Sequence, residues 1–157
     1  MTPPLLVFGW GNASRGDDAL GPQFVDRLRA RLGNRPDVEL IDDYQLMVEH
    51  ALDLAGRERV LFVDASLVCA PPFETRPLLP AADRSLSSHA LSPQALMQVF
   101  RDVQHAEPPP CTLLAIRGER FELGAPASGA ALAHLDAALQ WAQGWLAQPQ
   151  EVAACTS

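Results

Sequence analysis

Residues 5–21 read LLVFGWGNASRGDDALG, and the rest of the predicted fold extends from this segment. The first four residues, 5–8, are all apolar and are followed by Gly9, a pattern typical of a strand buried on both faces. Segment 9–17 is rich in Gly, Asn, Ser and Asp and predicts a loop. Apolar residues at every fourth position then predict a helix over 19–32.

The remainder of the chain repeats this order of strand and helix. Pro77 limits the strand candidate at 73–78 to the edge of a sheet, because proline has no N–H group to donate. Ser92 followed by a proline is a typical helix start. We therefore expect a doubly wound α/β sheet in a single domain over residues 1–157, with a frayed tail over 149–157. The other expected strands are 38–41, 60–63 and 112–116, and the other expected helices are 46–54, 92–103 and 129–146.

Charge and composition exclude several classes of partner. The chain has 157 residues, a net charge of −7 and no lysine. Nucleic acids and anionic membranes bind basic surfaces, so neither is expected as a partner. No apolar run reaches the ~20 residues that cross a bilayer, which predicts no membrane insertion. The first residues lack the basic stretch of a signal peptide, and we expect a cytoplasmic protein.

The loop at 9–17 does not match the common phosphate-binding patterns. A dinucleotide fingerprint needs a glycine where Ser14 stands, and a P-loop needs a lysine, which the chain lacks. Asp17 and Asp18 at the start of the helix would repel a phosphate. The loop is better suited to a cation or a polarised peptide group, and we expect no organic cofactor. A nucleotide-binding domain of flavodoxin-like shape remains a rival interpretation.

Acidic side chains are expected where the strands of the sheet end. In such sheets ligands bind beyond the carboxyl ends of the strands, and Asp18, Asp42 and Asp64 are predicted there. His89, in an irregular segment, can reach the same edge. Two carboxylates and an imidazole suit a divalent ion such as nickel, zinc or iron, and three protein ligands leave coordination positions open. Helix capping explains Asp17, Asp18 and Asp64 as well, and a structural histidine explains His89.

Three motifs in this order resemble those of the hydrogenase maturation proteases. They are Gly-Trp-Gly-Asn at 9–12 with an acidic pair and a glycine at 17–21, Val-Asp-Ala at 63–65, and Ser-Ser-His at 87–89. These endopeptidases trim the C-terminal extension from the large subunit of nickel–iron hydrogenases. The resemblance covers about residues 4–147.

The resemblance implies a three-layer α/β/α fold, with a five-stranded, mostly parallel sheet and one antiparallel edge-type strand. It also implies that Asp18, Asp64 and His89 are the metal ligands and the catalytic residues, with Asp42 as a candidate assistant. The nickel would be supplied by the partner, the precursor of a hydrogenase large subunit. The turn at 42–46, Asp-Asp-Tyr-Gln-Leu, departs from the glycine-rich turn of many members, so the resemblance does not identify which precursor is the substrate.

Two functions follow from this resemblance. The first is an endopeptidase, metal-dependent or aspartyl in type, that cuts the precursor after nickel insertion. Backbone N–H groups of loop 9–12 are candidates to stabilise an oxyanion, although turn geometry alone explains the glycines of this loop. The second is a non-catalytic protein that checks or delivers nickel through the same three side chains.

Overall fold

A single mixed sheet organises the computed structural model, which describes residues 1–82 and 91–148. The strand order is β2-β1-β3-β5-β4. The first four of these strands run parallel to one another, and β4 is antiparallel to β5 at the edge. The expected edge strand at 73–78 is therefore confirmed. The strands are β1 Leu5–Trp10, β2 Val38–Asp43, β3 Arg59–Ser66, β4 Phe73–Leu78 and β5 Cys111–Arg117.

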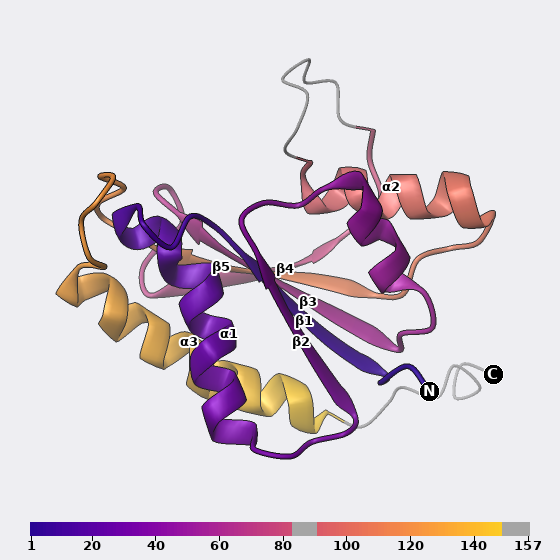
Figure 1. The fold of residues 1–157 in the computed structure, drawn as a ribbon, viewed down its shortest axis with the longest axis horizontal. Helices are drawn as coiled ribbons and strands as arrows, with labels where there is room; N and C mark the ends of the chain where they lie inside the picture. Colours follow the sequence, from indigo (N-terminus) through magenta and orange to yellow (C-terminus); the bar gives the residue numbers. More distant parts are fainter. Residues whose placement is uncertain (83–90, 149–157) are drawn as a thin grey trace.

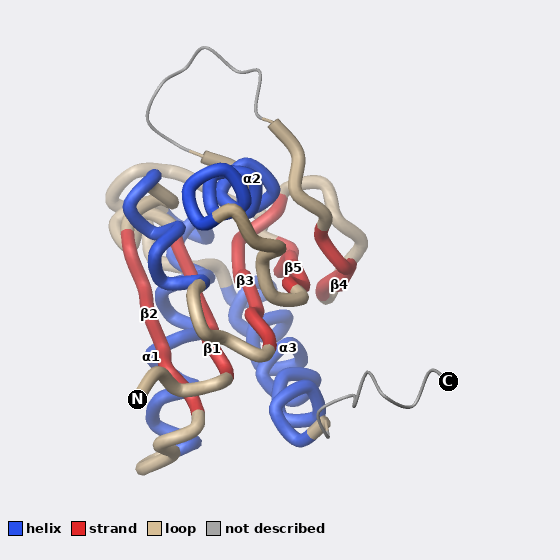
Figure 2. Tube along the Cα trace, turned by 90° about the vertical axis from the view of Figure 1, so that its right-hand side faces the viewer, coloured by secondary structure: helices blue, strands red, loops and turns tan. Residues whose placement is uncertain are grey.

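Helices cover both faces of this sheet and make three layers. Helices α1 and α3 pack on one face, and α2 and the 3-10 helix η2 pack on the other (Figures 1 and 2). The three-layer α/β/α prediction is thus confirmed. The expected helix at 46–54 is a 3-10 helix that begins later, at Val48. The helical elements are η1 Gly16–Ala19, α1 Leu20–Leu32, η2 Val48–Leu54, α2 Pro93–Gln104 and α3 Gly129–Ala147.

Strand alternation divides the core into two apolar clusters. In β3, Leu61 and Val63 face α1 and α3, whereas Val60 and Phe62 face α2 and η2. All four side chains are fully buried. This explains why the sequence of the central strands is continuously apolar, because both of their faces lie inside the protein.

Two glycines let α1 begin directly against β1. A Cβ atom on Gly9 would overlap the carbonyl oxygen of Gly21, and a Cβ atom on Gly21 would overlap the carbonyl oxygen of Trp10. The strand also continues through Gly9 to Trp10, two residues beyond the apolar run that predicts it. The loop and the start of α1 are therefore held close to the carboxyl ends of the strands.

Serine side chains cap the N-termini of α2 and α3. The Ser92 hydroxyl accepts a hydrogen bond from the Ala95 N–H at 3.0 Å, which confirms Ser92 as the N-cap of α2. Ser128 caps α3 in the same way, from the Ala131 N–H. Within residues 1–82 and 91–148, no helix combines the length and apolar character that crossing a bilayer requires.

Candidate active site

One row of side chains crosses the carboxyl edge of the sheet on the face covered by α2. Asp64 belongs to this face because Val60 and Phe62, at alternate positions of β3, pack against α2 and η2. Trp10 of β1 is paired with Asp43 of β2, and Asp64 is paired with Ala115 of β5. Acidic and aromatic side chains from neighbouring strands therefore share one edge.

The sequence predicts that the strand ends at Asp64, but in the structure Asp64 lies inside β3. The ladder to β5 continues for two more residues, through Ala65 and Ser66. The carboxyl group is half-buried. Its pKa is raised to about 7, chiefly by burial and also by the nearby charge of Asp18, while the hydrogen bond from the Ala65 N–H acts in the opposite direction. Asp64 thus changes charge near neutral pH, as acid–base groups of active sites do.

Asp18 is the second predicted carboxylate that the structure brings to this place. It is half-buried in η1, and its Oδ2 accepts a hydrogen bond from the Asn12 N–H at 2.9 Å. Its effect on the pKa of Asp64 shows that the two carboxylates interact electrostatically. Like charges held together disfavour the doubly ionised state, so the pair would be stabilised by a cation between them.

The third predicted ligand, His89, lies outside the described residues. Within the parts of the chain that the structure describes, no three His, Cys, Asp or Glu side chains form a metal-binding group. The ligand roles of Asp18, Asp64 and His89 all stay predictions.

Asp42, the predicted assistant, is separated from Asp64 by the sheet. Val38 and Leu40, at alternate positions of β2, pack in the core beneath α1 and α3. Asp42 shares their face, and its Oδ1 lies 3.8 Å from a guanidinium nitrogen of Arg29 in α1. Because successive residues of a strand face opposite sides, Asp43 rather than Asp42 lies on the same face as Asp64.

A buried histidine fixes the turn that follows Asp43. The Met47 N–H donates to Nδ1 of His50 at 2.8 Å, so the ring proton is on Nε2, which donates to Asp43 at 3.0 Å. The ring also meets the edge of Phe8 at 4.8 Å between centroids. Sequence reasoning assigns His50 no role, because nothing in its spacing shows that both ring nitrogens are paired.

The glycine loop is joined both to this turn and to Asp18. The side-chain amide of Asn12 donates to the Tyr44 hydroxyl at 2.9 Å, and the Gly11 N–H donates to the Asp43 carbonyl at 3.1 Å. The Asn12 N–H is used by Asp18. The N–H groups of Gly11 and Asn12 thus already donate hydrogen bonds within the protein. Neither is free to stabilise an oxyanion, which is the role considered for them from the sequence.

Gly11 is a position that only glycine fits. Its φ is +148°, and a Cβ atom there would overlap the backbone oxygen of Asp18. We expect Gly11→Ala to displace Asp18 and to lower the free energy of unfolding by about 2 kcal/mol. Thermal unfolding of both proteins measures this loss. Gly144→Ala in α3, where a Cβ atom meets nothing within 4 Å, is the control and should raise stability by up to about 1 kcal/mol. Equal stability of Gly11→Ala and wild type would contradict the expectation.

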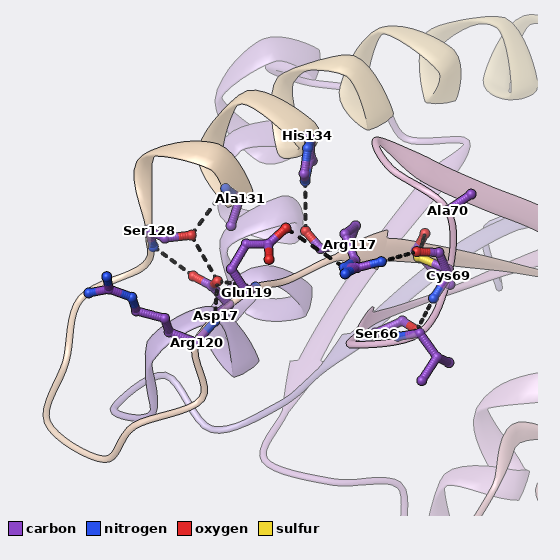
Figure 3. Close-up of polar contacts among 12 residues, drawn as sticks. Asp17, Ser66, Cys69, Ala70, Arg117, Glu119, Arg120, Ser128, Ala131 and His134 are labelled. Atoms are coloured by element: carbon purple, nitrogen blue, oxygen red, sulfur yellow. Dashed lines mark hydrogen bonds and ion pairs between the residues drawn. The ribbon is translucent and has the colours of Figure 1, made fainter.

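The sequence suggests that Asp17 caps a helix. In the structure it does not, and its carboxylate instead anchors the segment that follows β5. Neither η1 nor α1 has a side-chain cap. The fully buried carboxylate accepts hydrogen bonds from the N–H groups of Glu119, Arg120 and Ser128, at 2.6, 2.9 and 2.6 Å, and from the Ser128 hydroxyl at 2.8 Å (Figure 3). Burial raises the pKa of Asp17, but these hydrogen bonds outweigh it and hold the pKa below its ordinary value.

The adjacent acids therefore have different surroundings. The carboxylate of Asp17 is saturated by donors of the protein, whereas among the described residues the Asp18 carboxylate accepts one hydrogen bond, at Oδ2, and its charge acts on Asp64. A saturated carboxylate has little capacity left for a ligand. Of the two acids, Asp18 therefore keeps the greater capacity to bind a ligand.

A pocket of about 320 Å³ begins at Asp64 and extends over β5 and β4. One wall is the segment that follows β3, where the Ser66 hydroxyl accepts hydrogen bonds from the N–H groups of Val68 and Cys69. The Arg117 guanidinium donates to the Cys69 carbonyl at 2.8 Å and secures the same segment to β5 (Figure 3). Sequence reasoning misses this pocket, because its walls come from three strands. The other described lining residues are Ala65, Glu74, Thr75, Arg76, Leu113 and Ala115.

Comparisons with known proteins give matches by structure. No family model matches the sequence, and no curated protein matches it significantly. The hydrogenase maturating endopeptidase HybD from Escherichia coli superposes with a TM-score of 0.72 and 24% identity, over 90% of this chain and 91% of that chain. The NiFe hydrogenase maturation protease HycI from Thermococcus kodakarensis KOD1 gives 0.71 and 20%, over 93% and 94%. The hydrogenase 2 maturation peptidase of a Thaumarchaeota archaeon gives 0.65 and 21%, over 91% and 97%. The chain therefore has the fold of the hydrogenase maturation endopeptidases.

Proposed function

We propose that this protein is an endopeptidase that removes the C-terminal extension of a nickel–iron hydrogenase large-subunit precursor once nickel is inserted. The observation that carries the proposal is the pair formed by Asp18 and Asp64. These two acids come from separate motifs, 46 positions apart in the chain, and interact at the carboxyl edge of the sheet. Solved structures with the same fold are named as hydrogenase maturation proteases.

The nickel is part of the substrate in this proposal. Asp18, Asp64 and His89 approach the metal ion held in the precursor and so bring the scissile bond to the site. A divalent cation between Asp18 and Asp64 relieves their repulsion and favours the ionised form of both. With a pKa of about 7, Asp64 is only partly ionised near neutral pH without the cation, and a nickel-loaded precursor favours its ionised form.

Hydrolysis adds one water across the scissile peptide bond. The water oxygen bonds to the carbonyl carbon, the C–N bond breaks, and the released tail takes a proton on its new amine. A cation that polarises the carbonyl or the water lowers the barrier to this attack. The proton that the attacking water loses balances the proton that the leaving amine takes up.

The decisive experiment measures the intact mass of a candidate precursor before and after incubation with this protein. The precursor is used both nickel-loaded and nickel-free. We expect loss of a C-terminal peptide from the nickel-loaded form only. An unchanged mass of a precursor that still binds this protein would favour the non-catalytic, nickel-checking role instead.

The same mass measurement tests the predicted ligands. We expect His89→Ala and Asp18→Ala to lose at least 100-fold in processing rate, because either change removes a group that contacts the metal or the scissile bond. Their thermal unfolding should stay within a few degrees of wild type. Full activity of His89→Ala would refute its assignment as a ligand.

A further inference from the structure

We propose that the pocket beside Asp64 is the subsite for the first residues of the extension that is removed. This inference rests on the proposed function and specifies where the extension lies when the precursor is bound. Asp64 forms one end of the pocket, and Asp18 is absent from its described lining. If the nickel-bearing part of the precursor lies between the two carboxylates, the pocket remains for the residues after the scissile bond. These are the first residues of the extension.

The size of the pocket fits a short piece of peptide. Pockets for small ligands and cofactors hold about 300–1,000 Å³, and a volume of about 320 Å³ lies at the lower end of that range. It corresponds to about ten water molecules at roughly 30 Å³ each. The space accommodates one or two residues of an extended chain rather than an organic cofactor.

The lining favours an apolar residue. Leu113 and Ala115 of β5 form an apolar base, and Val68 stands at the wall. The charges of Glu74 and Arg76 are of opposite sign. The Glu74 carboxylate already accepts the Ala70 N–H at 2.9 Å. Away from Asp64, the lining therefore offers no net charge to a charged side chain, whereas an aliphatic side chain buries apolar surface there.

The walls are held in place before any substrate binds. The segment 66–70 is fixed by the Ser66 hydroxyl, by the Arg117 guanidinium and by the Glu74 carboxylate. The Cys69 thiol also contacts the Ala115 carbonyl, at 3.5 Å. A preformed pocket binds its ligand at a lower cost in ordering than a flexible one. It can therefore set the register of the tail relative to Asp64.

The variant Ala115→Leu fills this pocket. We expect it to lower kcat/KM for the nickel-loaded precursor at least tenfold, because the added carbons occupy the space of the tail residue. The control is Ala127→Leu, which adds the same atoms to a separate pocket of about 290 Å³ between α1 and the segment before α3. Ala127→Leu should process the precursor at the wild-type rate.

A compensating change in the substrate separates a blocked subsite from a damaged fold. Replacing the first two residues of the extension with glycine should restore processing by Ala115→Leu to within threefold of wild type acting on the same substrate. A misfolded variant would not recover in this way. Normal processing of the natural precursor by Ala115→Leu would overturn the assignment, and so would rescue only by glycine on the retained side of the cleaved bond.

Peptide binding tests the subsite without any cleavage. The probe is a fluorescent peptide with the sequence of the extension, followed by anisotropy. We expect wild type and Ala127→Leu to bind it, and Ala115→Leu to bind at least tenfold more weakly. Binding that is equal in all three, or absent from wild type, would refute the subsite. An unchanged precursor mass with this binding pattern intact would refute only the proposed cleavage.

Discussion

Asp17→Ala is expected to lower the free energy of unfolding by about 3–5 kcal/mol, which corresponds to a fall in Tm of roughly 10 °C. The substitution leaves three N–H groups and one hydroxyl without the buried carboxylate that accepts their hydrogen bonds. Each unsatisfied buried donor costs about 1–3 kcal/mol unless water reaches it. Calorimetric or circular-dichroism melting of purified protein measures the loss.

The comparison variant is Asp136→Ala. Asp136 forms an exposed ion pair with Arg27 at 3.1 Å, and exposed pairs contribute ~1 kcal/mol or less. Its melting temperature should stay within a few degrees of wild type. If Asp17→Ala melted at the same temperature as Asp136→Ala, the network around Asp17 would not carry the stability assigned to it.

The stabilisation by Asp17 should also disappear in acid. Its pKa in the folded protein lies below the ordinary value of 3.8. Protons then bind the unfolded chain first as the pH falls, so the contribution is complete above about pH 4 and is lost below it. Asp17→Asn and wild type should therefore converge in stability in strong acid. A difference that stays constant with pH would contradict the lowered pKa.

Asp64→Asn is expected to lose at least about 100-fold in processing rate and yet to be more stable than wild type above pH 7. The pKa of Asp64 is about 7 in the folded protein, against an ordinary value of 3.8. Between these two values the folded protein holds a proton that the unfolded chain has released. The stability of wild type consequently falls as the pH rises through this window, by about 1.4 kcal/mol per pH unit.

The neutral asparagine avoids this penalty. The difference in unfolding free energy between Asp64→Asn and wild type should be small near pH 4, should grow to about 4 kcal/mol near pH 7 and should stay constant above it. Urea unfolding at a series of pH values measures it. Parallel stability curves for the two proteins would refute the raised pKa.

Asp42→Asn is the matched change on the opposite face of the sheet. The geometry predicts processing within about twofold of wild type, because the Asp42 carboxylate lies beside Arg29 and not beside Asp64. A loss of processing as large as that of Asp64→Asn would contradict this expectation. It would mean that Asp42 assists the reaction, as the sequence motif suggests, despite its position beside Arg29.

Much of the fold can be predicted from the sequence because it depends on local patterns. The continuous apolar runs of β1 and β3 identify strands buried on both faces, and Pro77 identifies the edge strand. Strand ends are less certain, because pairing rather than composition decides them. Asp64 and Ser66 lie inside β3 since β5 continues beside them, although their side chains are polar.

The candidate site divides in the same way. Asp18 and Asp64 can be found from their positions after apolar strands, because the carboxyl ends of parallel strands meet at one edge. Where two acids are adjacent in the chain, this rule cannot say which of them lies in the site. Asp17 and Asp18 are adjacent in the chain, yet Asp17 accepts hydrogen bonds from the segment 119–128, whereas Asp18 accepts one from Asn12 and raises the pKa of Asp64. Asp42 and Asp43 are likewise adjacent and face opposite sides of the sheet.

The sequence by itself determined the order of strands and helices, the edge position of β4, and the two motifs that meet at the end of the sheet. It did so because periodicity, glycine and proline act over a few residues. Only the tertiary structure decided which acid of each pair faces the site, that His50 has both ring nitrogens bonded, and that a pocket adjoins Asp64. These features depend on contacts between residues distant in the chain, and burial and hydrogen bonding there, rather than residue type, set the charge and orientation of each group.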